Sequence, residues 1–273
     1  MLLHDNEIRI RHPAATMDLI LGVQLQAETD REYAEAQFNE NIEFDCEWLK
    51  ESQVNSSPAI VCGAAPSLLE GIELIKDKQK LGAVIFACNR AAQVLCENGI
   101  VVDYQVVLDP AKITESEFCD SAKTHLLSSF CYPPLFKRSN NPILWHLLTD
   151  FVVNRVEHLN RDFSYIGGGV TVANSTLCLA HTLGHREIEV FGMDSSYETS
   201  FYATGETLES IGSVQLLANI QHGGKNYKTT FDMKQQVVVF LKLEEELKKL
   251  GTKIRVHGTG LLPDVFNNQG ETK

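Results

Sequence analysis

The sequence lacks the features that mark secreted, disulfide-rich and membrane-spanning proteins. It has seven cysteines, but no two of them form a C-x-x-C pair, and several lie in apolar runs. This usage is typical of buried free thiols in a reducing compartment. The first residues, MLLHDNEIRIRH, place charges inside any apolar stretch, so they predict no signal peptide. No run approaches the roughly 20 apolar residues of a membrane helix, and we expect a cytoplasmic protein with no membrane partner.

Positive charge is also scarce. The chain has 24 Lys and Arg residues against 36 Asp and Glu residues, which gives a formal net charge of -12. A field of this sign repels the phosphate backbone of nucleic acids, so we expect no nucleic-acid partner. A phosphate-bearing small molecule would need local partners: helix N-termini, a few basic residues or a metal ion.

What the sequence does have is enough apolar content for a large core. Its 273 residues are 44% hydrophobic, which fits one large α/β domain with an appendage. Residues 26–41 are rich in Ala, Glu and Gln and favour a helix, and Phe44 and Trp48 would anchor this section to the main body. The section could cover the sheet or form a homo-oligomer contact. The expected organisation is a helical appendage at 1–55, an α/β domain at 56–262 and a tail at 263–273.

The stretch AIVCGAAPSLLE, residues 59–70, is the first motif with a chemical meaning. Residues 59–62 predict a buried strand, Gly63 a tight turn and Pro66 the start of a helix. Ser67 and Glu70 have the spacing of a capping box, so Ser67 is expected to be the N-cap. A helix N-terminus after such a turn offers free N–H groups to an anion, usually phosphate. The alternative is a plain strand-to-helix turn, since the motif is neither G-x-G-x-x-G nor a Walker loop.

The next segments continue the same alternation. Strands are expected at 83–87 and 104–108, with helices between them, and this order predicts right-handed crossovers. The predicted fold is therefore α/β, with a Rossmann-like, mostly parallel sheet and helices on both faces. In such a sheet the turn Gly63–Ser67, Asn89 and Asp109 would meet at the carboxyl edge, where ligands bind.

A second glycine-rich turn precedes a second strong helix. Gly168 and Gly169 belong to a run of three glycines, and Thr171 is a plausible cap for a helix at 172–183. This turn could hold an anion or a sugar, or it could be a flexible connection. A strand at 187–191 follows and ends near Asp194.

The remaining segments are less regular. We expect a strand at 125–130, a helix at 231–250 and a last strand at 253–256, while 144–153 fits a strand or a helix. Residues 197–228 show little apolar periodicity. They predict a lid over the ligand site or a surface loop.

Three motifs together resemble a known family. They are GAAPSLLEGI, FACNRAAQVLCENGIVVDYQVVLDP and GGGVTVANSTLCLAHTLGHREIEVFGMDSS. They resemble the MptE-like domain, which archaeal 6-hydroxymethylpterin diphosphokinases share with bacterial motility accessory factors, the flagellin glycosyltransferases. The layout is also similar to bacterial sialyltransferases. The resemblance covers roughly residues 58–195, with a fainter match at VHGTGLLPDV.

The resemblance implies a set of binding residues. Those expected to bind the nucleotide or the donor are Gly63, Pro66, Ser67, Asn89, Gly168, Gly169, Thr171 and Asp194. Asp109 matches the aspartate that ends the family's third strand. That strand ends here in LDP, with one aspartate, and this form looks more like the glycosyltransferases than the D-x-D-G of the pterin kinases.

These observations lead to a nucleotide-dependent transferase as the first hypothesis. It would be a glycosyltransferase that uses a nucleotide-activated sugar, such as a CMP-nonulosonic acid, with a sugar or protein acceptor. Asp109, His222 and His257 are candidates for the general base that deprotonates the acceptor.

Two alternatives remain open at the level of sequence. An ATP-dependent 6-hydroxymethylpterin diphosphokinase would use Asp109 and Asp194 to hold Mg²⁺. A nucleotide-binding module without catalysis would keep the fold and lose the chemistry. For the other two hypotheses the sequence leaves the metal ligands unknown.

Overall fold

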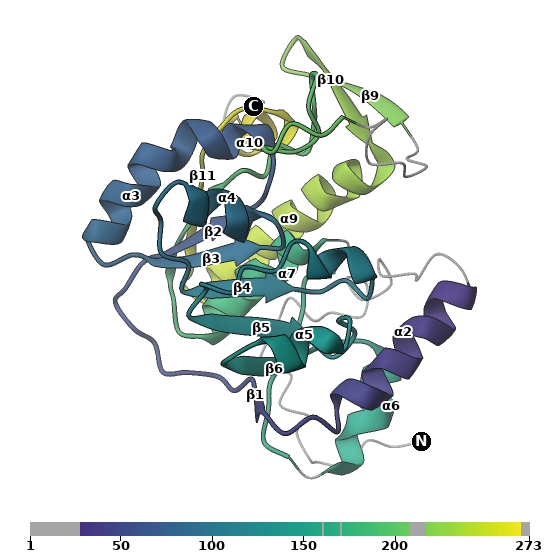
Figure 1. The fold of residues 1–273 in the computed structure, drawn as a ribbon. Coiled ribbons are helices and arrows are strands. Elements are labelled where there is room, and N and C mark those ends of the chain that lie inside the picture. Colours follow the sequence, from purple (N-terminus) through teal and green to yellow (C-terminus); the bar gives the residue numbers. More distant parts are fainter. Residues whose placement is uncertain (1–27, 160, 170, 208–216, 269–273) are drawn as a thin grey trace.

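The computed structural model describes residues 28–159, 161–169, 171–207 and 217–268. The part of the expected appendage before residue 28, the middle of the expected lid and the end of the expected tail lie outside these ranges. Within them the chain forms a large sheet, with helices on both faces, and a small hairpin at one end (Figure 1).

The large sheet has nine strands, and every pair in it is parallel. The order is β1-β6-β5-β4-β3-β2-β8-β11, and β7 pairs with β6. The strands are β1 (Glu47–Trp48), β2 (Ala59–Cys62), β3 (Val84–Cys88), β4 (Tyr104–Val107), β5 (Thr124–Ser128), β6 (Pro142–Leu147), β7 (Tyr165–Ile166), β8 (Glu187–Phe191) and β11 (Lys253–Val256). The predicted α/β fold with a parallel sheet is confirmed.

The central strands are buried on both faces, which explains why they read as continuous apolar runs. In β2, Val61 faces one apolar cluster and Ile60 faces the other. Phe86 and Ile85 of β3 alternate in the same way. This period of two places an unbroken core above and below the centre of the sheet.

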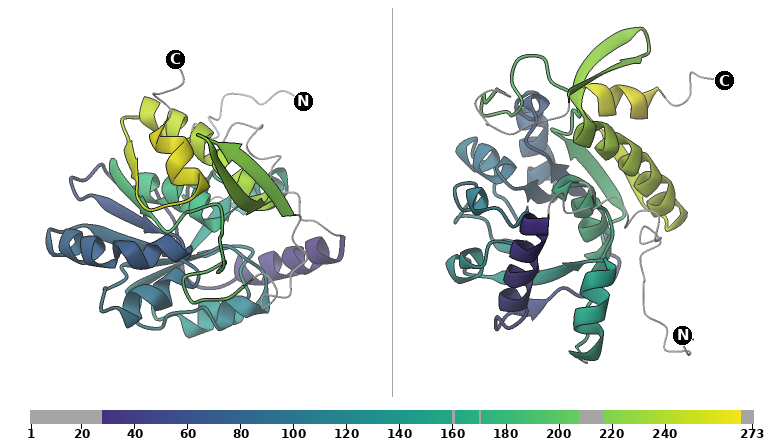
Figure 2. Two further views of the ribbon diagram at one scale, coloured as in Figure 1. Left: turned by 90° about the horizontal axis from the view of Figure 1, so that it is seen from above. Right: turned by 90° about the vertical axis from the view of Figure 1, so that its right-hand side faces the viewer.

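The helices form a layer on each face (Figure 2). Residues of α7 and α9 pack into the cluster that contains Val61, and residues of α3 and α4 pack into the other. The helices are α2 (Glu28–Asn41), α3 (Ile72–Lys80), α4 (Ala91–Glu97), α5 (Pro134–Arg138), α6 (Asp150–Val156), α7 (Val172–Thr182), α9 (Phe231–Lys249) and α10 (Leu261–Asn267), with 3-10 turns η2 (Pro66–Gly71), η3 (Lys112–Glu115) and η4 (Glu157–Leu159). Within the described ranges, none of them has the length and apolar character that a bilayer-spanning helix needs.

The described part of the N-terminal section is built onto the edge of the sheet. As expected, the described part of the 26–41 segment is helical, as α2, and Phe38 on it packs against Phe130 and Phe151 with ring centroids 5.5 and 5.1 Å apart. Trp48 is buried, and its strand β1 pairs with β6. The section therefore covers and extends the sheet edge, and it is not helical throughout.

The expected capping box at Ser67 is wrong. Pro66–Gly71 is a 3-10 turn whose N-cap is Ala65, with no side-chain hydrogen bond at the cap, and the α-helix begins only at Ile72. The Ser67 hydroxyl donates instead to Asp194, 127 positions later in the chain. The Ser67 hydroxyl thus bonds a distant carboxylate in place of the local backbone N–H that a cap would accept from.

Two other segments take a definite form. The ambiguous stretch at 144–153 is the end of β6 followed by α6, whose N-cap Thr149 accepts from the Val152 N–H. The expected lid contains the antiparallel hairpin of β9 (Leu217–His222) and β10 (Lys225–Thr230). The expected tail begins inside α10.

Candidate functional site

The sheet reverses its winding direction at β2. The chain passes from β2 to β3 on one side, and β8 pairs with β2 on the other side. The two backbones touch where these strands end, because a Cβ on Gly63 would overlap the carbonyl oxygen of Gly192. Such a reversal leaves a crevice at the carboxyl ends of the strands.

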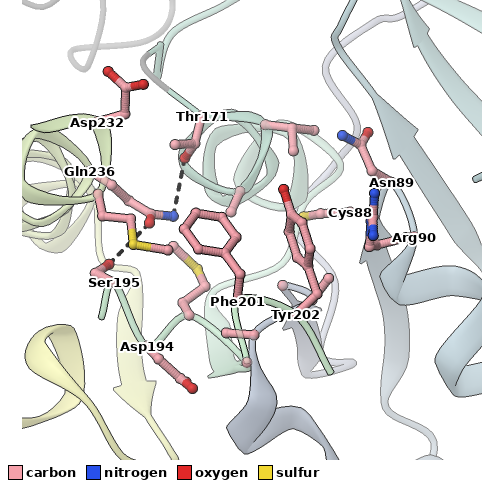
Figure 3. A pocket seen from close by; sticks show the side chains of 18 of the residues that line it. Cys88, Asn89, Arg90, Thr171, Asp194, Ser195, Phe201, Tyr202, Asp232 and Gln236 are labelled. Atoms are coloured by element: carbon pink, nitrogen blue, oxygen red, sulfur yellow. Dashed lines mark hydrogen bonds between the residues drawn. The ribbon is translucent and has the colours of Figure 1, made fainter. Parts of the chain in front are cut away.

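A cavity of about 370 Å³ lies at this edge (Figure 3). Its walls come from the ends of β2, β3, β4 and β8, from the first residues of α7 and from α9. The lining residues are 63–65, 88–90, 108–109, 117, 171–173, 192–195, 201–202, 230, 232–233 and 236.

The structure brings five of the expected residues to this cavity. They are Gly63, Asn89, Asp109, Thr171 and Asp194. The other expected residues lie elsewhere among the described residues and do not line it: Pro66, Ser67, Gly168, Gly169, His222 and His257.

Most of the N–H groups in the turn after β2 donate hydrogen bonds to acceptors within the protein. The Gly63 N–H donates to the carbonyl of Phe191 at 2.9 Å, and the Ala65 N–H donates to that of Gly192 at 3.0 Å. The Ser67 N–H donates to Asp194 at 3.0 Å. Among the described residues, only Ala64 in this turn has an N–H with no acceptor and also lines the cavity.

The start of α7 is different. Thr171 caps the helix by accepting from the Asn174 N–H, and the N–H groups of Val172 and Ala173 have no acceptor among the described residues. Both residues line the cavity, and the first turn contains no acidic side chain. Two free donors at the positive end of a helix dipole form a favourable place for an anion.

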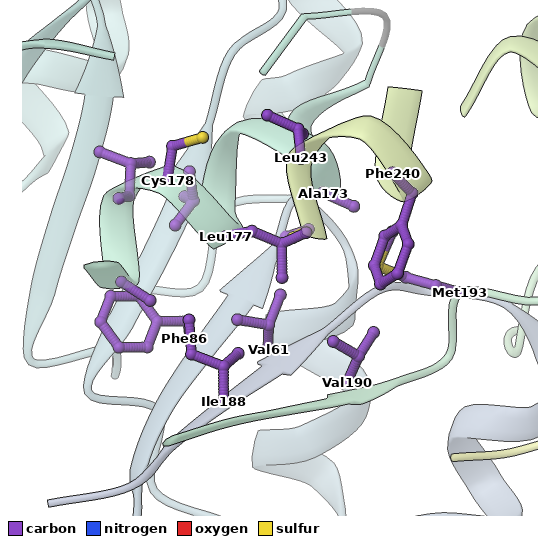
Figure 4. Packing of buried hydrophobic residues seen from close by; sticks show 14 of the residues in the cluster. Val61, Phe86, Ala173, Leu177, Cys178, Ile188, Val190, Met193, Phe240 and Leu243 are labelled. Atoms are coloured by element: carbon purple, nitrogen blue, oxygen red, sulfur yellow. The ribbon is translucent and has the colours of Figure 1, made fainter. Parts of the chain in front are cut away.

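The body of α7 holds this helix end in place. Ala173, Leu177 and Cys178 pack against side chains of the central strands, including Val61 and Phe86, in the cluster shown in Figure 4. Because the anchoring side chains are buried, the helix end has a fixed position relative to the strand ends.

Asn89 and Asp109 form a pair across the ends of β3 and β4. The Asn89 Nδ2 donates to the Asp109 Oδ2 at 3.0 Å. Asn89 has a φ of 44°, in the left-handed region that Asn tolerates better than most residues. Burial raises the pKa of Asp109, and the hydrogen bond from Asn89 lowers it by less. A carboxylate with a raised pKa beside a cavity is a candidate proton acceptor.

Asp194 joins two loops beneath the cavity. Its carboxylate accepts from both the N–H and the hydroxyl of Ser67, and its carbonyl accepts from the Leu262 N–H at 3.1 Å. Burial raises the pKa of Asp194 to about 6, although the two bonds from Ser67 act in the opposite direction. Ser67 and Asp194 were both expected to bind the nucleotide or the donor. In the structure they bond to each other, and this contact fixes the shape of the sheet edge.

The lining residues that the sequence analysis missed include Arg90, Glu117, Tyr202 and Gln236. The Arg90 guanidinium pairs with Glu117 and lies 4.0 Å from the ring centroid of Tyr202. Gln236 of α9 accepts from the Ser195 hydroxyl at 3.0 Å and donates to the Thr171 hydroxyl at 3.2 Å. The position of Arg90, next to Asn89 at a strand end, was one available signal, and the position of Tyr202 in the expected lid at 197–228 was another. Glu117 and Gln236 reach the site only through long-range packing.

The two expected histidines lie outside the cavity. His257 stacks on Phe191 with ring centroids 4.3 Å apart, and its Nε2 lies 2.7 Å from the Glu189 carboxylate. Burial alone would raise the pKa of Glu189, but the hydrogen bonds from Lys78 and His257 lower it. His222 ends β9, and its Nε2 is buried without a hydrogen-bond partner among the described residues.

No group of three or more potential His, Cys, Asp or Glu metal ligands occurs among the residues described. Asp109 and Asp194, which the diphosphokinase alternative assigns to Mg²⁺, therefore belong to no such group among these residues.

Comparison with known proteins finds a similar chain and similar solved structures. A chain from Treponema pallidum (strain Nichols), described only as an uncharacterized protein, is 30% identical over a match that covers 29% of this chain and 45% of the relative. This chain thus matches less than half the length of that relative.

Two solved structures are similar to this chain to different degrees. The MAf glycosyltransferase from Magnetospirillum magneticum AMB-1 has a TM-score of 0.66 at 19% identity, over 88% of this chain and 38% of that one. The sialyltransferase CstII from Campylobacter jejuni, solved with the substrate analogue CMP-3FNeuAc, has a TM-score of 0.41 at 15% identity, over 77% and 88%. The first shows a shared fold.

A family model identifies the group to which the fold belongs. The model described as 6-hydroxymethylpterin diphosphokinase MptE-like matches residues 33–200. This range includes most of α2, β1 and the strand ends around the cavity, and it is more than half of the chain. The protein is therefore a member of the MptE-like family.

Proposed function

We propose that the cavity binds a nucleotide-activated sugar and that the protein is a nucleotide-dependent glycosyltransferase. The observation that carries the proposal is the pair of N–H groups of Val172 and Ala173, which have no acceptor among the described residues and border a cavity at the reversal point of the sheet. The fold shared with the MAf glycosyltransferase is consistent with it.

The proposed chemistry follows from what lines the cavity. The acceptor hydroxyl gives its proton to the Asp109 carboxylate, and its oxygen bonds to the anomeric carbon of the sugar. The bond from that carbon to the phosphate oxygen breaks, and the electron pair goes to the phosphate. The N–H groups of Val172 and Ala173 stabilise the charge that develops there.

The charge of the cavity bears on the class of donor. Four carboxylates and one guanidinium belong to the described residues that line it: Asp109, Glu117, Asp194, Asp232 and Arg90. A donor with a single phosphate meets less repulsion in these surroundings than one with a diphosphate. A neutral sugar linked to CMP therefore suits the cavity better than one linked to UDP or GDP, whereas a CMP-nonulosonic acid, which has a carboxylate of its own, carries the same total charge as those donors.

A thermal-shift screen tests the proposal. The ligands are CMP, CDP, UDP, GDP and ATP, each with and without Mg²⁺, because a ligand that binds only the folded state raises the melting temperature. Stabilisation by CMP without metal is expected. Stabilisation by ATP only with Mg²⁺ would favour the diphosphokinase alternative, and tight binding without turnover would favour a non-catalytic module. The absence of any shift would exclude a nucleotide site.

A variant tests the role of α7 directly. In Val172→Pro the donor of Val172 is lost, but proline is well tolerated at the first position of a helix, and Thr171 already has the extended conformation that precedes proline. We expect CMP to bind about tenfold more weakly, as for the loss of one charge-assisted hydrogen bond.

Asp150→Pro is the matched control. Asp150 is the first residue of α6, whose cap Thr149 has φ -140° and ψ 155°, close to the -138° and 153° of Thr171. Asp150 does not line the cavity, so this variant should bind CMP like the parent. Equal binding by Val172→Pro and the parent would remove α7 from the site.

A further inference from the structure

Arg90 is the only Lys or Arg among the described residues that line the cavity. Its side chain is 17% exposed and lies against the ring of Tyr202, which in turn contacts Phe201 with centroids 5.0 Å apart (Figure 3). The aromatic ring fixes the plane of the guanidinium and shields one face of it from water. A shielded guanidinium at the wall of a cavity is well placed to bind an anion.

The hydrogen bonds of Arg90 leave room for a ligand. The guanidinium has five N–H donors. Two of them donate to Glu117, from Nε at 3.0 Å and from Nη2, and one donates from Nη1 to Glu206 at 2.8 Å. The other two have no acceptor among the residues that the structure describes.

The two carboxylates that hold Arg90 are not equivalent. The Glu117 side chain is 11% exposed, and its own backbone carbonyl accepts from the Gln105 side chain at 2.8 Å. The Glu206 side chain is 36% exposed and is otherwise held by the Thr204 hydroxyl, two residues away. Glu206 is the easier of the two to displace, because its side chain is the more exposed to water, whereas moving Glu117 would disturb the wall.

We propose that Arg90 binds the anionic group of the ligand and that Glu206 is an exchangeable internal partner, which this group displaces. The inference rests on the proposed function, since it assumes that the natural ligand enters this cavity. The group is a phosphate or a carboxylate, and both present a pair of oxygens that a guanidinium binds with two donors. Glu206 then competes with the ligand and tunes its affinity.

Glu206→Gln provides the test. The substitution removes the competing charge but keeps the size of an exposed side chain, so the fold should be retained. The probes are CMP, which offers a phosphate, and free N-acetylneuraminate, which offers a carboxylate, both measured by calorimetry. We expect about fivefold or greater tightening for the probe whose anion reaches Arg90, and little change for the other.

Two further variants make the result specific. Asp232→Asn removes the same charge from a lining residue that forms no ion pair with Arg90, so equal tightening by both variants would show a general field effect and overturn the proposal. Arg90→Lys keeps a partner for Glu117 and should weaken the same probe about tenfold.

The outcomes separate this inference from the proposed function. If CMP binds but neither probe responds to Glu206→Gln, the role of Arg90 is wrong and the nucleotide site stands. If neither probe binds to any variant, both proposals are wrong.

Discussion

The two glycine-rich turns that precede helices look alike in sequence, but their hydrogen bonds differ. At the first turn, the N–H groups of Gly63, Ala65 and Ser67 all donate within the protein. At the second, those of Val172 and Ala173 have no acceptor in the described part of the chain, and both residues line the cavity. The first turn joins strands and loops, whereas the second leaves two N–H donors at the wall of the cavity. A turn of this kind is an anion site only where its donors are not already used.

The helix types agree with this difference. The first turn leads into a 3-10 turn with no side-chain cap, and the second leads into an α-helix capped by Thr171. A regular first turn of an α-helix directs its free N–H groups along the helix axis, so the dipole of α7 adds to the donors. Substitutions can therefore test whether the turn at Gly63 is structural and whether the turn before α7 is free to bind an anion.

The largest effect is expected at the first turn. In Gly63→Ala the added Cβ overlaps the backbone of Gly192, where neither strand end can move easily. We expect a loss of about 3 kcal/mol or more in the free energy of unfolding, measured by urea denaturation. Gly82→Ala is the control, because its Cβ meets nothing within 4 Å and it adds only the strain of a positive φ, about 1 kcal/mol. Equal losses in the two variants would contradict the close approach.

A pH-dependent effect of intermediate size is expected at Asp194. In the folded state the pKa of Asp194 is about 6, against 3.8 for an ordinary Asp. Between these pH values the folded protein therefore keeps a proton on Asp194 that the unfolded chain releases. The unfolding free energy should therefore fall as pH rises from about 4 to 6, by roughly 3 kcal/mol at most from this group.

Asp194→Asn cannot titrate, so comparison with this variant isolates the effect. The parent should lose stability relative to Asp194→Asn as pH rises through that window, in denaturation curves recorded at each pH. Parallel curves for the two proteins would show that Asp194 has an ordinary pKa.

The smallest effect is expected at the cap of the second turn. Thr171→Val removes the oxygen that accepts from the Asn174 N–H and from Gln236, and should cost about 1 kcal/mol. Thr171→Ser keeps that oxygen and should retain most of the stability. Melting temperatures measure both, and identical values for the valine and serine variants would mean that the cap contributes nothing.

The order of the elements follows from the amino-acid sequence alone. Apolar runs bounded by glycine and polar residues predict the central strands, and their alternation with helices implies a parallel sheet. Because the carboxyl ends of parallel strands share one edge, the strand pattern is sufficient to place Gly63, Asn89 and Asp109 together. Thr171 is recognisable as a cap from local pattern, since the capping interaction spans only three residues.

Which of these groups face the cavity depends on tertiary contacts. Ser67 satisfies a local capping rule, yet its hydroxyl bonds Asp194, and no local pattern contains a partner 127 residues away. Glu117 and Gln236 come to the site from segments with no motif. The physical reason is that local patterns report the backbone conformation of short segments, whereas the use of each donor and carboxylate depends on contacts between distant segments.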